Sequence, residues 1–156
     1  MNRASLLRAA IAVLVLALIF PRPLPLEPAD APQSGLPLTK LQAGSHLITA
    51  QLALTPRQQQ KGLMFRRSMR VDEGMLFVFQ EAAIKCFWMM NTYLPLTLAF
   101  IEQDGSIVSL HDMHPRSFRS NCSTRPVRYV LEMNQGWFAE RGVKVGARLS
   151  GQPFVQ

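Results

Sequence analysis

Residues 86–101 read Cys-Phe-Trp-Met-Met-Asn-Thr-Tyr-Leu-Pro-Leu-Thr-Leu-Ala-Phe-Ile and carry the strongest pattern in this 156-residue chain. Two apolar runs flank the polar dipeptide Asn91-Thr92 and a proline, Pro95. Apolar side chains then alternate with period two, which predicts a strand over 94–101. Since both faces of that strand are mostly apolar, we expect it at the centre of the core, covered on both sides.

Turn and cap residues place the other elements around this strand. Thr55, followed by Pro56 and by Gln58, predicts a capped helix of about two turns that stops at Gly62. Asn134 is a candidate cap for a second short helix that runs through residue 141. The sequence Asp104-Gly105 predicts a hairpin turn. Further strands are expected over 46–54, 75–79, 86–90, 107–110, 127–134 and 143–149, with a polar loop over 111–125.

Short strands at hairpin spacing, with two short helices, predict a mainly β fold. We expect one compact antiparallel β barrel or sandwich over residues 38–156, preceded by an apolar N-terminal helix. In residues 127–134 the apolar side chains alternate with Arg128, Glu132 and Asn134, among others. That alternation predicts a strand buried on one face only.

The N-terminus has the pattern of an export signal. Arg3 and Arg8 precede an unbroken apolar run over 9–20, which is shorter than a bilayer span. Residues 1–20 are therefore expected to be a signal peptide, or a membrane anchor formed by residues 6–20. The Pro-rich residues 21–37 are expected to be a linker. The domain would then lie beyond the inner membrane, either periplasmic, secreted or anchored to it.

The chain has two cysteines, Cys86 and Cys122. In an oxidising compartment an even pair favours a disulfide. Two inert thiols are the alternative, followed by a reactive site, which the absence of Cys-x-x-Cys spacing disfavours.

With these pieces in order, the chain resembles the family catalogued as domain of unknown function 192. The matching stretches are Gly62-Leu63-Met64-Phe65-Arg66, residues 74–79, 87–92, Pro95-Leu96, 128–132 and 134–142 with Gly146, and they occur in the family's order. The resemblance covers residues 47–149. It implies a compact, mostly β, single-domain fold, often preceded by a signal or anchor. No activity is assigned to the family, so it provides no catalytic residue.

The candidate ligand site combines one aromatic wall, polar groups and charge. Trp88 would supply the wall, Asn91 and Thr92 orienting hydrogen bonds, and Arg66 with Arg128 the charge for an anionic ligand. The favoured alternative is that Asn91 and Thr92 form a structural corner bonded to loop backbone, since buried polar groups usually pair with backbone. Glu132 belongs to the same candidate site, either as a ligand contact or as an ion-pair partner of Arg128.

Other functional classes have weaker support. Glu132 could act as the acid or base of a hydrolytic enzyme on an envelope polymer, although the sequence shows no paired carboxylates. His111 and His114 are too few ligands for a structural zinc site, which needs four. The eight methionines could bind Cu(I), but most lie in apolar strand patterns that favour a core role. No motif predicts a cofactor or a catalytic group. The net charge of +7 favours an anionic envelope ligand, and nucleic acid is not expected as a partner in that compartment.

Overall fold

The computed structural model describes residues 30–154, so the predicted signal or anchor and residues 21–29 of the linker lie outside it. Among the described residues, no helix combines the length and the apolar character needed to cross a membrane. The strands and helices, in chain order, are β1 (Leu38–Ala43), β2 (His46–Ala53), α1 (Pro56–Lys61), β3 (Glu73–Ala83), β4 (Cys86–Phe87), β5 (Leu96–Ile101), β6 (Ile107–Met113), β7 (Asn121–Cys122), β8 (Val127–Asn134), α2 (Trp137–Glu140) and β9 (Leu149–Ser150).

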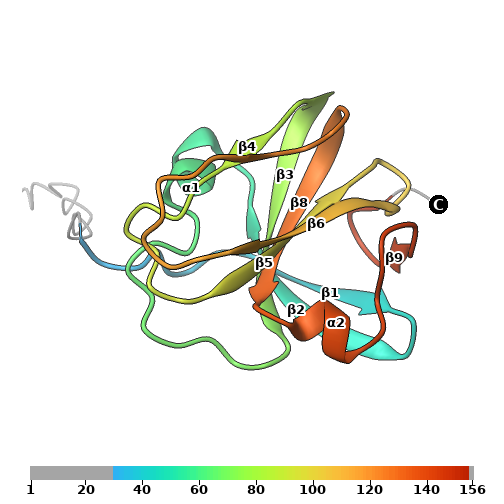
Figure 1. The fold of residues 1–156 in the computed structure, drawn as a ribbon, viewed down its shortest axis with the longest axis horizontal. Helices are drawn as coiled ribbons and strands as arrows, with labels where there is room; N and C mark the ends of the chain where they lie inside the picture. The colour runs from blue at the N-terminus through green and yellow to red at the C-terminus, as the bar shows by residue number, and fades with distance from the viewer. Residues whose placement is uncertain (1–29, 155–156) are drawn as a thin grey trace, which may run out of the picture.

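One sheet of seven strands forms the body, in the order β6-β5-β8-β3-β2-β1-β9, and it curls into a half-barrel (Figure 1). Every neighbouring pair in it is antiparallel except β2 and β3, which run parallel. Strands β4 and β7 form a separate two-stranded sheet. The prediction of a mainly β fold with two short helices is confirmed.

Strand β5 has the buried, two-sided position predicted for it. All six of its residues are buried. Leu98 and Phe100 belong to one core cluster, whereas Ala99 and Ile101 belong to the cluster on the opposite face of the sheet. The period-two alternation therefore divides the side chains of β5 between two cores.

The predicted start of α1 is also confirmed. The Thr55 hydroxyl accepts a hydrogen bond from the Gln58 backbone N–H at 3.3 Å, and the Gln58 side chain accepts one from the Thr55 N–H at 2.9 Å. Gly62 ends the helix with φ 47°. The buried amide of Gln33 donates to the carbonyls of Gln58 and Gly62, so the chain before β1 already packs against the helix end.

Several expected elements differ in extent. Strand β4 ends at Phe87, because the chain turns at residues 89–92 instead of continuing to Met90; a backbone bond from the Thr92 N–H to the Met89 carbonyl closes that turn. Strand β3 extends well beyond the expected residues 75–79. Strand β6 continues through His111, so the predicted polar loop begins later than expected.

Two further expectations are wrong. Asn134 does not cap α2: its side-chain amide donates to the Arg70 carbonyl at 2.9 Å, and Gly136 occupies the cap position. Strand β8 is buried on both faces, not on one, because Leu131 packs in one core cluster and Val130 packs in the cluster on the opposite face of the sheet. This second correction places Glu132 inside the molecule.

Candidate functional site

A cavity of about 220 Å³ lies between α1, β3 and β4. Its walls come from residues 59–64, from Phe77 and Phe79 of β3, from residues 85–88, and from Thr92 and Glu132. We refer to it as the Glu132 cavity. Trp88 in its wall is 52% exposed, so the cavity meets solvent there. For comparison, a cavity of about 150 Å³ accommodates benzene.

Glu132 is the most unusual residue of this cavity. It lies in the interior of β8, in register with Met75 of β3 and Leu98 of β5, and is only 4% exposed. Within residues 30–154 its carboxyl group makes no ion pair and no hydrogen bond to the protein, and its oxygens are reached from the cavity. Burial raises the pKa of Glu132 to about 8, and the nearby charge of Arg66 opposes this shift only partly. At neutral pH the carboxyl is therefore mostly protonated, and it can donate a hydrogen bond into the cavity.

Arg66 lies near Glu132 without bonding to it. Its guanidinium donates a short hydrogen bond to the Gln51 side chain, while its buried Nε–H has no hydrogen-bond partner among the described residues. Burial lowers the pKa of Arg66, and the charges of Glu73 and Glu132 oppose that shift. Arg66 does not line the cavity, so its role there is electrostatic and at longer range.

Arg128 does not line the cavity, although it is bonded to a residue that does. Its Nε–H donates to the Phe79 carbonyl at 3.2 Å, and its guanidinium lies 5.9 Å from the centre of the Tyr129 ring. The alternative in which Glu132 forms an ion pair with Arg128 is therefore wrong. Alternate residues of a strand lie on one face, so Arg128 and Glu132 share a face of β8. They are four positions apart, and Val130 lies between them on that face.

The Asn91-Thr92 corner has an unusual backbone conformation. Asn91 has φ 56°, in the left-handed region that Asn tolerates, and its carbonyl accepts a hydrogen bond from the Phe65 N–H at 2.8 Å. Phe65 itself has φ 66°, a costly conformation for a bulky side chain. The Thr92 hydroxyl donates to the Met90 carbonyl at 3.3 Å. Thr92 thus bonds loop backbone, as expected for a structural corner. Phe65 and Asn91, both with positive φ, are joined by a backbone hydrogen bond beside the cavity.

A second hollow of about 380 Å³ adjoins the first. Asn91, Met90 and Arg57 line it, and it shares Lys61 and Trp88 with the Glu132 cavity. Trp88 therefore stands in the wall of both. Of the six predicted ligand residues, the structure brings Trp88, Thr92 and Glu132 together and leaves Asn91 next to them.

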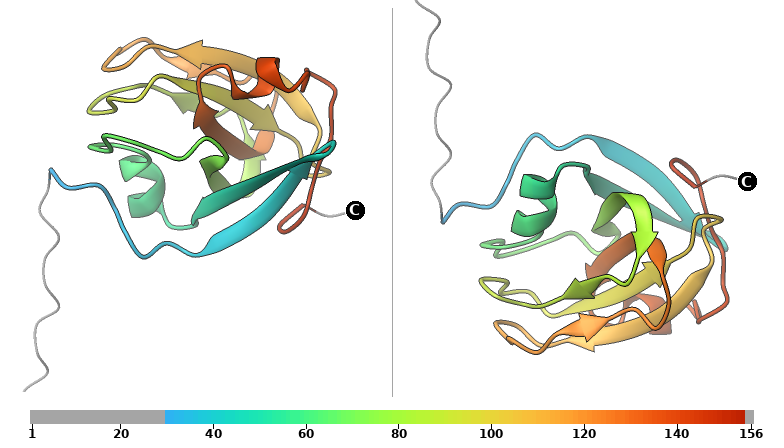
Figure 2. Two further views of the ribbon diagram at one scale, coloured as in Figure 1. Left: turned by 90° about the horizontal axis from the view of Figure 1, so that it is seen from below. Right: turned by 90° about the horizontal axis from the view of Figure 1, so that it is seen from above.

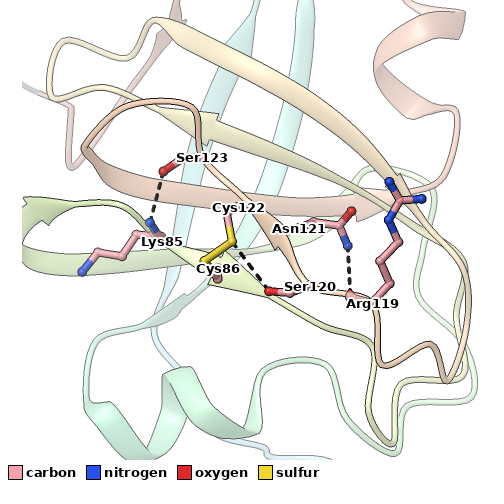
Figure 3. Close-up of a disulfide and its surroundings, with 7 residues drawn as sticks. All are labelled: Lys85, Cys86, Arg119, Ser120, Asn121, Cys122 and Ser123. Carbon is pink, nitrogen blue, oxygen red and sulfur yellow. Dashed lines mark hydrogen bonds between the residues drawn. A yellow bond between two sulfur atoms is a disulfide. The ribbon is translucent and has the colours of Figure 1, made fainter.

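The cysteines form a disulfide, with their Cα atoms 4.0 Å apart. The bridge joins directly opposed residues of β4 and β7, and Figure 3 shows it between the two short strands. Next to it, the Lys85 N–H donates to the Ser123 hydroxyl at 3.1 Å. Cys86 lines the Glu132 cavity, so the disulfide fixes one of its walls.

Lys61 and Lys85, which were not predicted as site residues, also line the cavity. Lys61 lies in the last turn of α1, and the Lys85 ammonium group lies 4.1 Å from the centre of the Phe79 ring. The sequence contained a signal for Lys61, because the predicted helix start at Thr55 and stop at Gly62 place Lys61 in the last turn. Nothing in the sequence showed that Lys85 would face this helix.

The histidines do not gather at a metal site. Within residues 30–154, no group of three or more His, Cys, Asp or Glu side chains could hold a metal ion. His111 lies in β6, with its ring edge-on to Phe100 at 5.6 Å and within 3.2 Å of the Ser109 hydroxyl. The expectation that His111 belongs to the polar loop is wrong, because β6 continues past it.

Comparison with known proteins identifies a sequence family and several similar solved structures, two of which are described here. The sequence model of the family DUF192, described as "Uncharacterized ACR", matches residues 39–151. A proposed transcription regulator from Sinorhizobium meliloti 1021 is 42% identical, with a TM-score of 0.72; the match covers 76% of this chain and 97% of the other. A protein of unknown function from Novosphingobium aromaticivorans DSM 12444 is 32% identical, with a TM-score of 0.69, and covers 80% and 93% respectively. No curated protein matches the chain.

Proposed function

The chain belongs to the family DUF192, and we propose that it is an exported binding module that holds a small anionic ligand in the Glu132 cavity. The observation that carries the proposal is the Glu132 carboxyl, buried in a cavity wall without a hydrogen-bond partner among the described residues. Its oxygens are not among the fully buried unpaired atoms of residues 30–154, so they face the open cavity, where a ligand group can reach them. A ligand in the cavity would supply the missing partner.

Charge favours an anion as that ligand. Lys61 and Lys85 line the cavity, and Glu132 is the only carboxylate among its lining residues. Because the pKa of Glu132 is about 8, the carboxyl is close to neutral at pH 7, and the cavity carries a net positive charge. A ligand carboxylate or phosphate would accept a hydrogen bond from the protonated Glu132 carboxyl and would face the ammonium groups of the two lysines.

Aromatic side chains define the rest of the ligand. Phe77, Phe79 and Phe87 line the cavity together with Trp88. Their rings leave room for a flat or apolar body about the size of a substituted benzene ring. The proposed ligand is therefore a small amphipathic acid.

Export rests on different support. The positive and then apolar N-terminus has the pattern of a signal or anchor, and the Cys86–Cys122 disulfide suits an oxidising compartment. We place the domain outside the inner membrane, where its ligand would be a component or a metabolite of the envelope.

Binding can be tested with matched small probes at two pH values. Benzoate and phenylphosphonate, with benzylamine and benzamide as cationic and neutral counterparts, would be titrated while Trp88 fluorescence is recorded. We expect the acids to bind best, about tenfold more weakly at pH 9 than at pH 6.5, because Glu132 then ionises. Lys61→Gln should weaken binding of the acids, whereas Lys144→Gln, a matched change far from the cavity, should not. A preference for the amine that strengthens with pH would overturn the proposal.

A hydrolytic role for Glu132 is the second candidate. A carboxyl that stays protonated near neutral pH can act as a general acid. However, a glycosidase of the usual kind needs a second carboxylate across the scissile bond, and none of the other residues lining the cavity supplies one. Turnover of purified wall or glycan substrates, lost in Glu132→Gln, would favour this role over binding alone.

A third class is suggested by the Sinorhizobium structure, which is described as a proposed transcription regulator. A regulator of that kind would contact DNA, commonly through a recognition helix in the major groove. Within residues 30–154 the two helices have only six and four residues, and neither has the length of a recognition helix. We therefore keep ligand binding as the proposed function.

A further inference from the structure

The connections that follow α1, join β4 to β5 and join β6 to β7 gather at one end of the half-barrel (Figures 1 and 2). Backbone hydrogen bonds join them: the Phe65 N–H donates to the Asn91 carbonyl at 2.8 Å, and the Met89 N–H to the Ser117 carbonyl at 2.9 Å. The described chain also begins at this end, beside α1. The loop end, as we call it, comprises residues 57–67, 88–93 and 114–119.

The loop end is strongly basic. Its three segments contain six lysines and arginines and no aspartate or glutamate. Arg57, Arg67, Arg116 and Arg119 are exposed. One exposed carboxylate, that of Asp30, shares the second hollow with Arg57. The domain's positive charge is thus concentrated on one end, which is the pattern expected of a surface that meets a dense negative charge.

Two large apolar side chains project among these cations. Phe118 is 72% exposed and Trp88 is 52% exposed, and they lie on adjacent loops. Exposing an aromatic side chain costs free energy unless something covers it. Aromatic side chains beside cations are favoured at the interface between water and lipid head groups, where rings enter the interface and cations face phosphates.

The position of the chain's start limits where this end can lie. Nine residues separate Phe20, the last residue of the apolar run, from Asp30, which lies beside the loop end in the hollow with Arg57. Nine residues reach at most about 30 Å when fully extended. If the apolar run stays in a membrane, the loop end is the part of the domain held nearest to it.

From these observations we propose that the loop end docks on the surface of an anionic phospholipid bilayer, with Trp88 and Phe118 in the interface and the arginines on lipid phosphates. This contact goes beyond the ligand cavity, and it does not require the cavity to be occupied. It adds a second attachment to the one expected from the N-terminal segment. A single weak anchor and a basic surface together hold a protein at a membrane better than either alone.

The fluorescence of Trp88 measures docking directly in the full-length chain. The protein has two tryptophans, and Trp137 is only 1% exposed, so changes in quenching report on Trp88. The full chain would be reconstituted into vesicles of phosphatidylcholine alone, or of phosphatidylcholine with phosphatidylglycerol. We expect brominated lipid to quench Trp88, and acrylamide quenching to fall, in the anionic vesicles only, with reversal at high salt.

Matched double variants separate docking from simple tethering. Phe118→Ser with Arg119→Gln removes one exposed ring and one cation from the loop end. Val145→Ser with Lys144→Gln makes the same kind of change on the face near α2, where Val145 is 57% exposed. The first pair should weaken docking more than fivefold, because one cation near an anionic surface accounts for about that factor, and the second pair should have no effect.

Two results would overturn the proposal. One is equal quenching of Trp88 in neutral and anionic vesicles, which would leave only the N-terminal attachment. The other is protection of Trp88 by an oligonucleotide under conditions in which anionic vesicles give none, which would identify nucleic acid as the occupant. Either result leaves the ligand proposal standing, because that proposal is tested by small acids without lipid.

Discussion

Replacing Glu132 by glutamine tests whether the buried carboxyl is held for function at the expense of stability. The folded protein binds the Glu132 proton more tightly than the unfolded chain does, because burial raises the pKa from 4.5 to about 8. The stability contributed by the protonated carboxyl is fully present below pH 4.5. It is lost as the pH rises through the range between these two values, since the folded state must then ionise a buried group or hold a proton that the unfolded chain has released.

The size of the effect follows from the same two pKa values. One pH unit corresponds to about 1.4 kcal/mol, so between pH 4.5 and pH 7 the wild type loses on the order of 3 kcal/mol that Glu132→Gln keeps. Above pH 8 the difference should level off at about 5 kcal/mol. Glutamine has nearly the same shape and does not titrate, so the packing around residue 132 is retained.

Urea denaturation at pH 4.5, 7 and 9, followed by tryptophan fluorescence, measures this difference. Glu81→Gln is a matched control, because Glu81 is an exposed carboxylate on the adjacent strand β3, and its replacement should change stability by less than about 0.5 kcal/mol at each pH. A stability difference between Glu132→Gln and wild type that stays constant from pH 4.5 to pH 9 would refute the reasoning. It would mean that Glu132 ionises as easily in the folded protein as in the unfolded chain.

Three other changes test the frame around the cavity by chemical denaturation. Gly74→Ala should destabilise by about 3 kcal/mol, because its Cβ would collide with the Met133 sulfur and a backbone oxygen; unchanged stability would show that β3 and β8 lie further apart. Replacing Cys86 and Cys122 by serine should cost about 4 kcal/mol, as expected for a loop closed across 36 residues, and should abolish the effect of reductant; a persistent effect would contradict the bridge. Thr55→Ala should cost about 1 kcal/mol, and Thr55→Ser much less, if the cap is formed as described.

The fold could be predicted from the sequence to the extent that local chemistry specifies it. The hairpin at Asp104-Gly105 formed because glycine accepts the positive φ of 88° that the turn requires. Thr55 and Gln58 started α1 for an equally local reason. Strand β1 was not predicted, because residues 38–43 mix polar and apolar side chains and depend on pairing with both β2 and β9.

The candidate site was predicted less well, because its geometry depends on residues far apart in the chain. The alternation in β8 correctly separated Glu132 from its apolar neighbours, but a period of two does not say which face meets solvent. The polar row was taken as the exposed one. In the structure, core clusters cover both faces of β8, so the same alternation places a carboxyl in the interior.

Trp88 links the two proposals, because it lies in the wall of the Glu132 cavity and among the exposed side chains of the loop end. A domain docked through this end would present the mouth of its cavity to the bilayer surface, where amphipathic acids concentrate. The two roles can still be separated with residues that serve only one. Glu132→Gln should abolish the pH dependence of acid binding and leave docking unchanged, whereas Phe118→Ser should weaken docking and leave acid binding unchanged. If both variants impaired both properties equally, the cavity and the loop end would be one surface, and the ligand would have to be a lipid bound in place.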